Sequence, residues 1–328
     1  MKRVLITGGT GSFGRAFLKR ILNDYPSIER IVIFSRDELK QWEMSEYFPT
    51  TKYPQLRYFI GDIRDFERLN TAVKGIDTIV HAAALKHVPV AEYNPTEFIK
   101  TNINGTENIV RVALANNVKR VVSLSTDKAA APINLYGATK LCADKLIVSA
   151  NNIKGSQDIK FSVVRYGNVM GSRGSVLPFF LKKKESGVLP ITDEKMTRFN
   201  ISLEEGVDMV LWSIENLLGG EILVPKIPSF KVMDLAEAIA PECKKEIIGI
   251  RPGEKIHEVL ITESDSAYTL DLGKYYSILP PEKINDEKYK QIPSKKVPSD
   301  FVYCSGKNEE FLCVDQLRKM ISSYQSPT

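Results

Sequence analysis

Short runs of apolar residues alternate along the first half of the chain with stretches whose apolar residues recur at helical spacing. The runs are rich in Val and Ile and are continuously apolar, at residues 3–7, 30–35, 56–62, 78–84, 120–126 and 161–168. Strands that helices cover on both faces have this continuous pattern. Between the first two runs, Phe13, Phe17 and Ile21 follow the period of a helix. The alternation predicts an α/β fold with a doubly wound parallel sheet.

The alternation becomes irregular after about residue 169, where glycine and proline are frequent. A strand-like run occupies residues 221–225, and a helical pattern follows at 233–240. We expect residues 169–328 to form mainly a smaller C-terminal substrate-binding lobe and a C-terminal tail. The strand near 221–226 is expected to return to the main sheet.

Composition excludes several classes of protein. At 328 residues, with 43% hydrophobic and 26% charged residues, the chain can bury a sizeable core and has the balance of a globular protein. Its net charge of +5 is too small to indicate nucleic acid, although it suits a small anionic substrate. We find no apolar run of about 18 residues that would cross a membrane, and no CxxC pair among the four cysteines. We therefore expect a cytoplasmic protein with no membrane partner and no bound metal.

The first apolar run leads directly into a glycine-rich loop that is followed by a helix. Glycines allow a tight turn and let a pyrophosphate approach the backbone N–H groups at the start of the helix. Because the strand and the helix lie where such a motif needs them, the loop predicts a Rossmann dinucleotide-binding domain over residues 1–168. The loop residues expected to bind the cofactor are Gly8, Thr10, Gly11, Ser12, Phe13 and Gly14.

The end of the second predicted strand faces the expected position of the adenosine ribose. An acidic residue there would bind a ribose 2′-hydroxyl, whereas an arginine suits a 2′-phosphate. Arg36, with Ser35 before it and Lys40 behind it, therefore favours NADP over NAD. The alternative is a solvated Arg36 beside Asp37 as a helix cap. Other residues expected at the cofactor are Asp62, Ile63, Ala82, Lys86, Tyr136, Lys140 and Val169.

Candidate catalytic residues follow the strand at 120–126. Tyr136 and Lys140 lie one helical turn apart, and the strand before them ends at the sheet edge where ligands bind. A nearby ammonium and a positive nicotinamide ring would lower the pKa of the phenol, so that it could act as a base. Here the sequence resembles the extended short-chain dehydrogenase/reductases, whose triad corresponds to Thr126, Tyr136 and Lys140. The resemblance also implies that Asp127 and Lys128 are the acid–base pair that a nucleotide-sugar dehydratase needs and a 4-epimerase does not.

A longer set of segments resembles one family, the inverting UDP-N-acetylglucosamine 4,6-dehydratases that begin pseudaminic acid biosynthesis. These segments are residues 35–41, 84–95, 125–140, 165–175, 196–199 and 249–255, and the resemblance extends to about residue 262. In retaining sugar dehydratases an Asp-Glu pair stands in place of Asp127 and Lys128. Two residues depart from the family pattern, since Asn200 replaces Trp and Ala131 replaces Asn. Both lie near the expected sugar pocket.

The resemblance implies a substrate site for UDP-N-acetylglucosamine. Lys86 would reach the cofactor or the sugar. Asn168, Arg198 and Arg251 would hold the uridine diphosphate, because arginine forks suit phosphate oxygens. Glu254 would accept a hydrogen bond from a ribose hydroxyl. Thr192 completes the expected set.

The implied reaction is an internal redox cycle with NADP. Tyr136 takes the O4 proton as the C4 hydride leaves, Lys128 removes H5, and Asp127 protonates the departing C6 hydroxyl. Hydride then returns to C6 and C5 is reprotonated on the opposite face. The product would be UDP-2-acetamido-2,6-dideoxy-L-arabino-hex-4-ulose. Lys128 must then be neutral and Asp127 protonated, which a dry, closed pocket would favour.

Other readings of the sequence are a partial dehydratase that releases the UDP-6-deoxy-GlcNAc-5,6-ene, a UDP-sugar 4-epimerase, and a non-catalytic NADP-sensing regulator. The intact Tyr136 and Lys140 argue against the regulator, and Asp127 and Lys128 argue against the epimerase. Related enzymes assemble, so we also expect a homo-oligomer, either a dimer or a hexamer.

Overall fold

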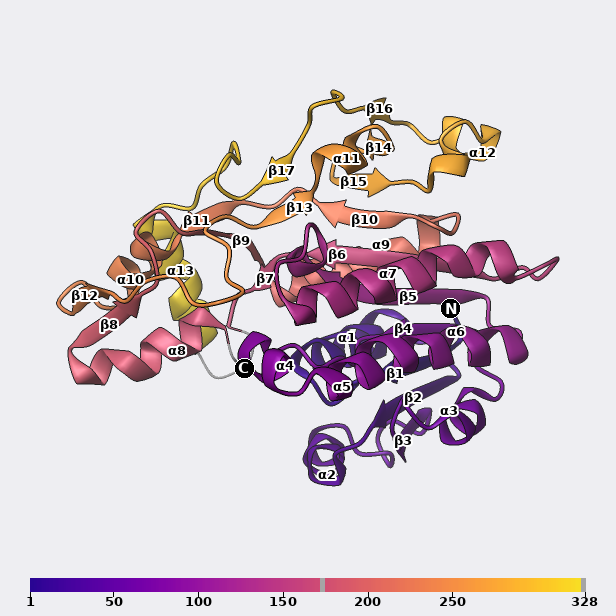
Figure 1. Cartoon of the computed structure of the whole chain (residues 1–328). Coiled ribbons are helices and arrows are strands. Elements are labelled where there is room, and N and C mark those ends of the chain that lie inside the picture. The colour runs from indigo at the N-terminus through magenta and orange to yellow at the C-terminus, as the bar shows by residue number, and fades with distance from the viewer. Residues whose placement is uncertain (172–174, 326–328) are drawn as a thin grey trace.

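A row of parallel strands forms the centre of the fold (Figure 1). In chain order these strands are β1 (Arg3–Thr7), β2 (Arg30–Ser35), β3 (Leu56–Ile60), β4 (Thr78–His81), β5 (Arg120–Thr126), β6 (Lys160–Tyr166) and β10 (Ile222–Pro225). Their order in the sheet is β3-β2-β1-β4-β5-β6-β10, and each neighbouring pair is parallel. The order of β1 to β6 is that of a Rossmann fold, so the predicted α/β class is confirmed. The computed structural model describes residues 1–171 and 175–325.

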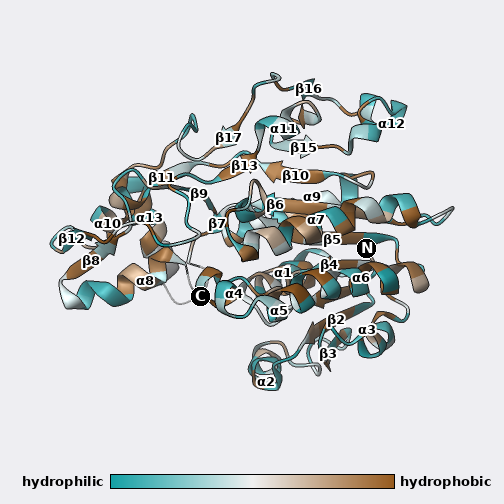
Figure 2. Cartoon of the chain, in the orientation of Figure 1, coloured by the Kyte–Doolittle hydropathy of each residue, from teal (hydrophilic) through white to brown (hydrophobic). Residues whose placement is uncertain are grey.

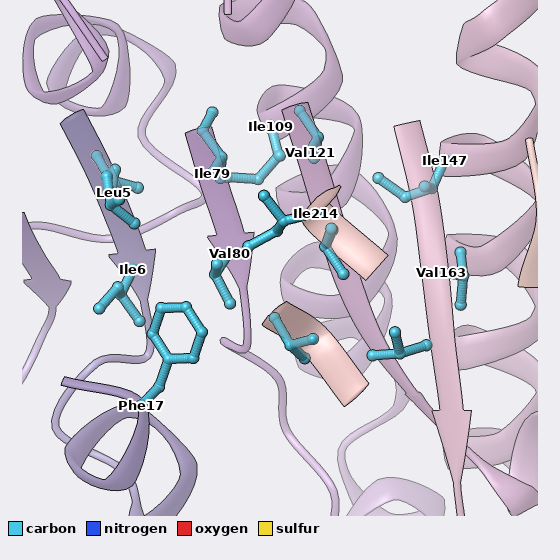
Figure 3. Packing of buried hydrophobic residues seen from close by; sticks show 14 of the residues in the cluster. Leu5, Ile6, Phe17, Ile79, Val80, Ile109, Val121, Ile147, Val163 and Ile214 are labelled. Atoms are coloured by element: carbon cyan, nitrogen blue, oxygen red, sulfur yellow. The ribbon is translucent and has the colours of Figure 1, made fainter. Parts of the chain in front are cut away.

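Helices cover both faces of this sheet (Figure 2). They include α1 (Ser12–Asp24), α2 (Glu38–Tyr47), α3 (Phe66–Val73), α6 (Gly105–Ala115), α7 (Leu135–Ile153) and α9 (Leu203–Asn216). Helices α1 and α9 pack on each other, as do α3, α6 and α7. Figure 3 shows side chains from these helices, such as Phe17 and Ile109, packed against strand residues such as Val80 and Ile79. Burial of each such side chain stabilises the fold by roughly 1.5–3 kcal/mol.

The strands end earlier than the apolar pattern predicted. Strand β3 stops at Ile60 and β4 at His81, and the run at 161–168 is divided between β6 and the short strand β7 (Asn168–Val169). Strand β7 belongs to a separate small sheet with β9 (Thr197–Ile201) and β11 (Ser229–Lys231). The last residues of these runs therefore do not belong to the main sheet and begin the loops at its carboxyl edge.

The last third of the chain extends the main sheet with antiparallel strands. Strand β15 (Tyr275–Ile278) pairs with β10, β14 (Thr269–Asp271) pairs with β15, and β16 (Lys295–Lys296) lies at the edge. The short lengths of these strands and the prolines between them hide the alternation that would have predicted them.

A second apolar cluster lies at one end of the molecule (Figure 1). It is built from α8 (Val176–Lys183), β8 (Val188–Ile191), α10 (Val232–Ile239) and α13 (Val314–Gln325), with β12 (Lys244–Ile247) paired to β8. The helix expected at 233–240 is α10. Residues 172–174 of the segment 165–175 lie outside the described residues.

Short elements complete the described part of the chain. They are α4 (Val88–Tyr93), α5 (Pro95–Phe98), a π-helical turn (Ile99–Asn104), β13 (Val259–Ile261), α11 (Glu263–Ser266), α12 (Glu287–Lys290) and β17 (Tyr303–Cys304), with 3-10 turns at Asp127–Ala129, Lys184–Ser186 and Pro281–Lys283. Within residues 1–171 and 175–325, no helix is both long enough and apolar enough to cross a membrane.

Candidate active site

A cavity of about 600 Å³ lies at the carboxyl ends of the parallel strands. Ligands bind at this edge in doubly wound folds. The expected cofactor residues all line it: Gly8, Thr10, Gly11, Ser12, Phe13, Gly14, Ser35, Arg36, Lys40, Asp62, Ile63, Ala82, Lys86, Tyr136, Lys140 and Val169. Thr126, Asp127 and Lys128 line the same cavity, so the fold brings the glycine loop and the candidate catalytic residues together.

The glycine loop is held by close backbone contacts. Gly8 has a φ of +64°, and its N–H donates to the Phe34 carbonyl at 2.9 Å. A Cβ at Gly14 would lie only 2.3 Å from the Gly9 carbonyl oxygen, so a larger residue cannot fit without moving the loop. The N-cap of α1 is Gly11, which has no side chain to bond the first N–H groups of the helix. Those groups are thus available to an anion.

His81 lies beneath this loop and is fully buried at the end of β4, as the strand pattern predicted. Its Nδ1 lies 2.8 Å from the Thr7 hydroxyl oxygen, and its Nε2 lies 3.2 Å from that of Thr106. Burial, with a smaller contribution from the charge of Lys140, lowers the pKa of His81 to about 3. The imidazole is therefore neutral and joins β1 to β4 and α6.

Two cations lie at the end of β2. Arg36 is half-exposed and its guanidinium is 3.8 Å from the Asp62 carboxylate. Lys40 forms an ion pair with Asp37, whose side chain also accepts a hydrogen bond from the Lys40 backbone N–H at 3.0 Å. Asp37 thus caps α2, while Arg36 and Lys40 both line the cavity.

Tyr136 and Lys140 lie in the first turns of α7, and both are buried. The Lys140 ammonium donates to the Leu124 carbonyl at 2.8 Å. Burial raises the pKa of Tyr136 to about 12, against the opposing effects of the Lys128 charge and a hydrogen bond with Thr126. Burial also lowers the pKa of Lys140, and Asp144 partly offsets that effect. The protein groups alone therefore do not produce the lowered phenol pKa that we expected, because burial outweighs them.

Asp127 and Lys128 form a 3-10 turn directly after β5. Asp127 Oδ1 accepts hydrogen bonds from the Thr126 hydroxyl at 2.8 Å and from Lys128 Nζ at 3.0 Å. A Cβ at Gly137 would lie 2.2 Å from the Lys128 carbonyl oxygen. Gly137 is therefore the residue that lets α7 pack against this turn, and we did not identify it from the sequence.

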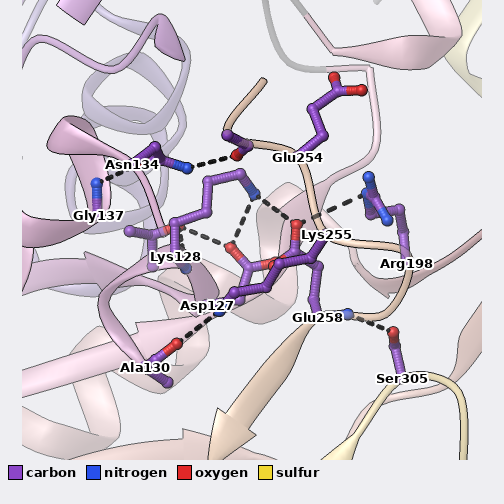
Figure 4. A network of polar contacts seen from close by, with 12 residues as sticks. Asp127, Lys128, Ala130, Asn134, Gly137, Arg198, Glu254, Lys255, Glu258 and Ser305 are labelled. Atoms are coloured by element: carbon purple, nitrogen blue, oxygen red, sulfur yellow. Dashed lines mark hydrogen bonds and ion pairs between the residues drawn. The ribbon is translucent and has the colours of Figure 1, made fainter. Parts of the chain in front are cut away.

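A second carboxylate, Glu258, contacts Lys128 and was also missed. Its Oε1 is 3.4 Å from Lys128 Nζ and 3.7 Å from Arg198 Nε (Figure 4). Burial would lower the pKa of Lys128, but the charges of Asp127 and Glu258 outweigh it and raise this pKa above its ordinary value. Lys128 is thus an ammonium in this structure, not the neutral amine that we expected of a closed pocket. Glu258 follows the segment 249–255 by three residues, and its neighbours His257 and Val259 form no motif that would distinguish it.

The expected substrate residues do not all reach the cavity. Lys86 and Asn168 line it, and burial and the charge of Lys128 lower the pKa of Lys86. Arg198 instead donates to the backbone carbonyls of Thr197 and Ile256, besides its contact with Glu258. The remaining residues, Thr192, Arg251 and Glu254, are not among those that line the cavity.

Arg251 and Glu254 form an ion pair with each other, and the Arg251 side chain is 60% exposed. Thr192 is buried directly after β8. Within the described ranges, no group of three or more His, Cys, Asp or Glu residues could hold a metal ion.

The strand order, the glycine loop and the Thr126, Tyr136 and Lys140 set define an enzyme of the extended short-chain dehydrogenase/reductase superfamily. Residues 4–280 match the model of the family described as "Polysaccharide biosynthesis protein", and the chain belongs to that family. An inverting UDP-N-acetylglucosamine 4,6-dehydratase of Campylobacter jejuni is 52% identical over 98% of this chain and 97% of its own length. A UDP-glucose 4-epimerase of Rickettsia bellii is 42% identical over 98% of this chain and 95% of its own.

Solved structures show the same fold. Pen from Bacillus thuringiensis superposes with a TM-score of 0.89 and 38% identity, covering 99% of this chain and 98% of its own. DesIV, a dTDP-glucose 4,6-dehydratase of Streptomyces venezuelae with NAD bound, has a TM-score of 0.71 at 20% identity over 98% of this chain and 97% of its own. The second likeness concerns the fold alone.

Proposed function

We propose that this enzyme is a dehydratase that converts UDP-N-acetylglucosamine into the 4-keto-6-deoxy sugar with inversion at C5. The product is UDP-2-acetamido-2,6-dideoxy-L-arabino-hex-4-ulose, an early intermediate of pseudaminic acid biosynthesis. One observation carries the proposal: an Asp127–Lys128 pair, 3.0 Å apart, lies in the same cavity as Tyr136 and Lys140. Elimination across C5 and C6 needs such an acid and base, whereas epimerisation at C4 does not. The 52% identity to an inverting dehydratase supports the same substrate.

The cofactor is proposed to be NADP. The Gly8 and Gly14 loop and the start of α1 would suit a pyrophosphate, and the charges of Arg36 and Lys40 at the cavity wall support a 2′-phosphate. When bound, the nicotinamide supplies a hydride acceptor at C4 and later a hydride donor for C6. The protein residues position the sugar and move its protons.

Three proton transfers are assigned to the protein. Tyr136 accepts the O4 proton, Lys128 removes H5, and Asp127 protonates the departing C6 hydroxyl. Lys128 is an ammonium at rest and its Nζ is 3.0 Å from Asp127 Oδ1. Transfer of one proton from Nζ to Oδ1 produces the neutral amine and the protonated acid together, with no change in the charge of the pair. The pair is therefore proposed to titrate as a unit.

Substrate contacts are proposed for Lys86 and Asn168 at the cavity wall. Arg251 and Glu254 would have to exchange their mutual ion pair for contacts with the nucleotide. Arg198, which lies beside Glu258, would contact the diphosphate of the substrate. Thr192 would lie at the diphosphate end of the substrate site. We also propose a homo-oligomer, which light scattering at micromolar concentration tests; a monomer would contradict it.

The test of function is NMR of the purified protein with UDP-N-acetylglucosamine and no added cofactor. In D₂O, deuterium is expected at C5 of the product, and hydrogen that starts on C4 is expected on C6 of the same sugar. Absence of transfer from C4 to C6 would refute the dehydratase. A product in which the hydrogen has returned to C4 and a double bond joins C5 and C6 would identify the partial dehydratase instead.

A second candidate is a UDP-sugar 4-epimerase, which the 42% identity to a UDP-glucose 4-epimerase favours. It predicts a C4 epimer with no deuterium at C5. A non-catalytic regulator predicts no product. The same NMR experiment therefore separates all of these activities.

A further inference from the structure

Glu258 has no role in the reaction steps given above, although it contacts one of the reacting groups. We propose that Glu258 is a positioning residue that holds Lys128 between two carboxylates and retains the proton that Lys128 shares with Asp127. This inference rests on the proposed dehydratase function. Glu258 acts through Lys128, and its own contacts are with protein groups (Figure 4).

Two hydrogen bonds with Ser305 fix the backbone of Glu258. Its N–H donates to the Ser305 hydroxyl at 2.9 Å, and its carbonyl accepts from the Ser305 N–H at 2.8 Å. The Ser305 hydroxyl also lies 2.8 Å from that of Thr197. The carboxylate is therefore presented to Lys128 by a rigid support at the start of β13, and the ammonium lies between Asp127 Oδ1 and Glu258 Oε1.

An ordinary structural ion pair does not account for this arrangement. Glu258 is only 2% exposed, and burying a carboxylate is costly unless its oxygens are paired. Yet Oε2 of Glu258 and Oδ2 of Asp127 are both buried and have no hydrogen-bond partner among the described residues. Buried polar atoms without partners are uncommon in folded proteins. Two such oxygens beside one lysine indicate a group of side chains arranged for proton transfer.

The charges in the cluster explain what Glu258 contributes. With Lys128 as an ammonium, the two carboxylates leave the trio with one net negative charge, which Arg198 faces at 3.7 Å. When the N–H bond of Lys128 breaks and an O–H bond forms on Asp127, Glu258 keeps its charge and Arg198 remains its partner. The net charge of the cluster does not change, so no ion is left alone. Lys86 and Lys255 are the other cations whose charges reach this cluster.

Removal of the Glu258 charge should make the shared proton easier to lose. An opposite charge at this distance changes a pKa by roughly 1–3 units. In Glu258→Gln, the shared proton should therefore leave at a lower pH, and with it the acid that protonates the C6 hydroxyl. The positive charge of Arg198 lowers the pKa of Lys128. In Arg198→Met, which removes this charge, the shared proton should therefore leave at a higher pH.

The experiment measures two steps in the same samples between about pH 7 and pH 11, a range that extends above the ordinary pKa of a lysine. Reduction of the bound cofactor on addition of UDP-N-acetylglucosamine reports oxidation at C4, and formation of the 6-deoxy product reports the elimination that needs the acid. The variants are Glu258→Gln, Glu258→Asp and Arg198→Met. Glu263→Gln, which changes an exposed acid five residues along the chain, is the matched control.

We expect Glu258→Gln to lose formation of the 6-deoxy product at a pH at least about one unit below that of the wild type, with cofactor reduction changed less than about threefold. Glu258→Asp, which keeps the charge, should restore the wild-type profile at a lower rate. An unchanged profile in Glu258→Gln, or equal losses in both steps, would overturn the inference. If Glu258→Gln does not fold, Arg198→Met decides the question. The inference is overturned if the pH dependence of elimination in Arg198→Met is unchanged or moves to lower pH. A wild type that never reduces its cofactor with this sugar refutes the proposed function itself.

Discussion

The glycine loop at residues 8–14 lines the cavity, and the cluster of Asp127, Lys128, Arg198 and Glu258 reaches it through Asp127 and Lys128, but the two are built by different means. The loop has no charged side chain, and it depends on close backbone contacts and free N–H groups at the start of α1. The cluster consists of buried charges that compensate each other. A loop of the first kind is sensitive to added volume, whereas a cluster of the second kind is sensitive to the loss of one charge.

The contrast teaches that binding and chemistry can be changed separately. Substitutions on the loop side should alter cofactor affinity or stability. Substitutions on the cluster side should alter individual reaction steps and their pH dependence.

The largest effect is expected at Tyr136. Tyr136→Phe removes one hydroxyl, so transfer of the O4 proton should fail and reduction of the bound cofactor should slow by about 10²–10⁴-fold. Stopped-flow absorbance after addition of UDP-N-acetylglucosamine measures this rate. The melting temperature should stay at the wild-type value, because only one hydroxyl is removed. A wild-type rate of cofactor reduction would remove Tyr136 from the role of base.

The next largest effect is expected in the free energy of unfolding at low pH, and it depends on His81 beneath the glycine loop. Its pKa is about 3 in the folded protein and 6.5 in a model peptide, so protonation favours the unfolded chain. The stability from neutral His81 is complete above pH 6.5 and is lost as the pH falls towards 3. The free energy of unfolding should fall by about 1.4 kcal/mol per pH unit in this range, or about 3 kcal/mol at pH 4.5. Denaturant titrations of the wild type and of His81→Gln measure it, and an equal pH slope in both would contradict the prediction.

A smaller effect is expected at Arg36, which is half-exposed. Arg36→Ala should weaken NADP binding by about tenfold, at the lower end of what a hydrogen bond to a charged group contributes. NAD binding should hardly change, because NAD has no 2′-phosphate. Fluorescence titration with both cofactors makes the comparison. Equal losses for NADP and NAD would show that Arg36 does not select the cofactor.

The smallest effect is expected at Ala131, in the loop between the cluster and α7. Its φ is +45°, a conformation that costs an alanine about 1–2 kcal/mol and that asparagine adopts more readily. Ala131→Asn should therefore stabilise the protein by about 0.5–1 kcal/mol, as measured by thermal unfolding. The control is Ala138→Asn, which changes a helical position and should not stabilise. A lower melting temperature for Ala131→Asn would contradict the strain argument.

Much of the cofactor side could be predicted because its residues follow the ends of parallel strands. The apolar runs located β1, β2 and β5 correctly, and strands of this kind deliver their following residues to one edge. Gly8, Arg36 and Tyr136 therefore reach one cavity although they are distant in sequence. The end of β4 was less predictable, because the apolar residues Ala82 to Ala84 continue into the loop.

The acid–base cluster was only half predictable. Asp127 and Lys128 follow a strand and were expected at the site, whereas Glu258 arrives from the segment before β13. The same holds for Arg251, whose motif suggested a phosphate contact but whose side chain is exposed and paired with Glu254. The antiparallel edge formed by β14 and β15 was missed too, since three- and four-residue strands carry little periodic signal.

The sequence by itself determined the parallel sheet, the glycine loop and the identity of the residues at the carboxyl edge. These depend on local periodicity and on the direction of buried strands, which apolar runs encode directly. Only the tertiary structure decided which charges meet. Glu258 reaches Lys128 because Ser305 holds its backbone, and burial raises the pKa of Tyr136 although two nearby groups oppose it. Such contacts and desolvation depend on packing between distant segments, and no local pattern in the chain records them.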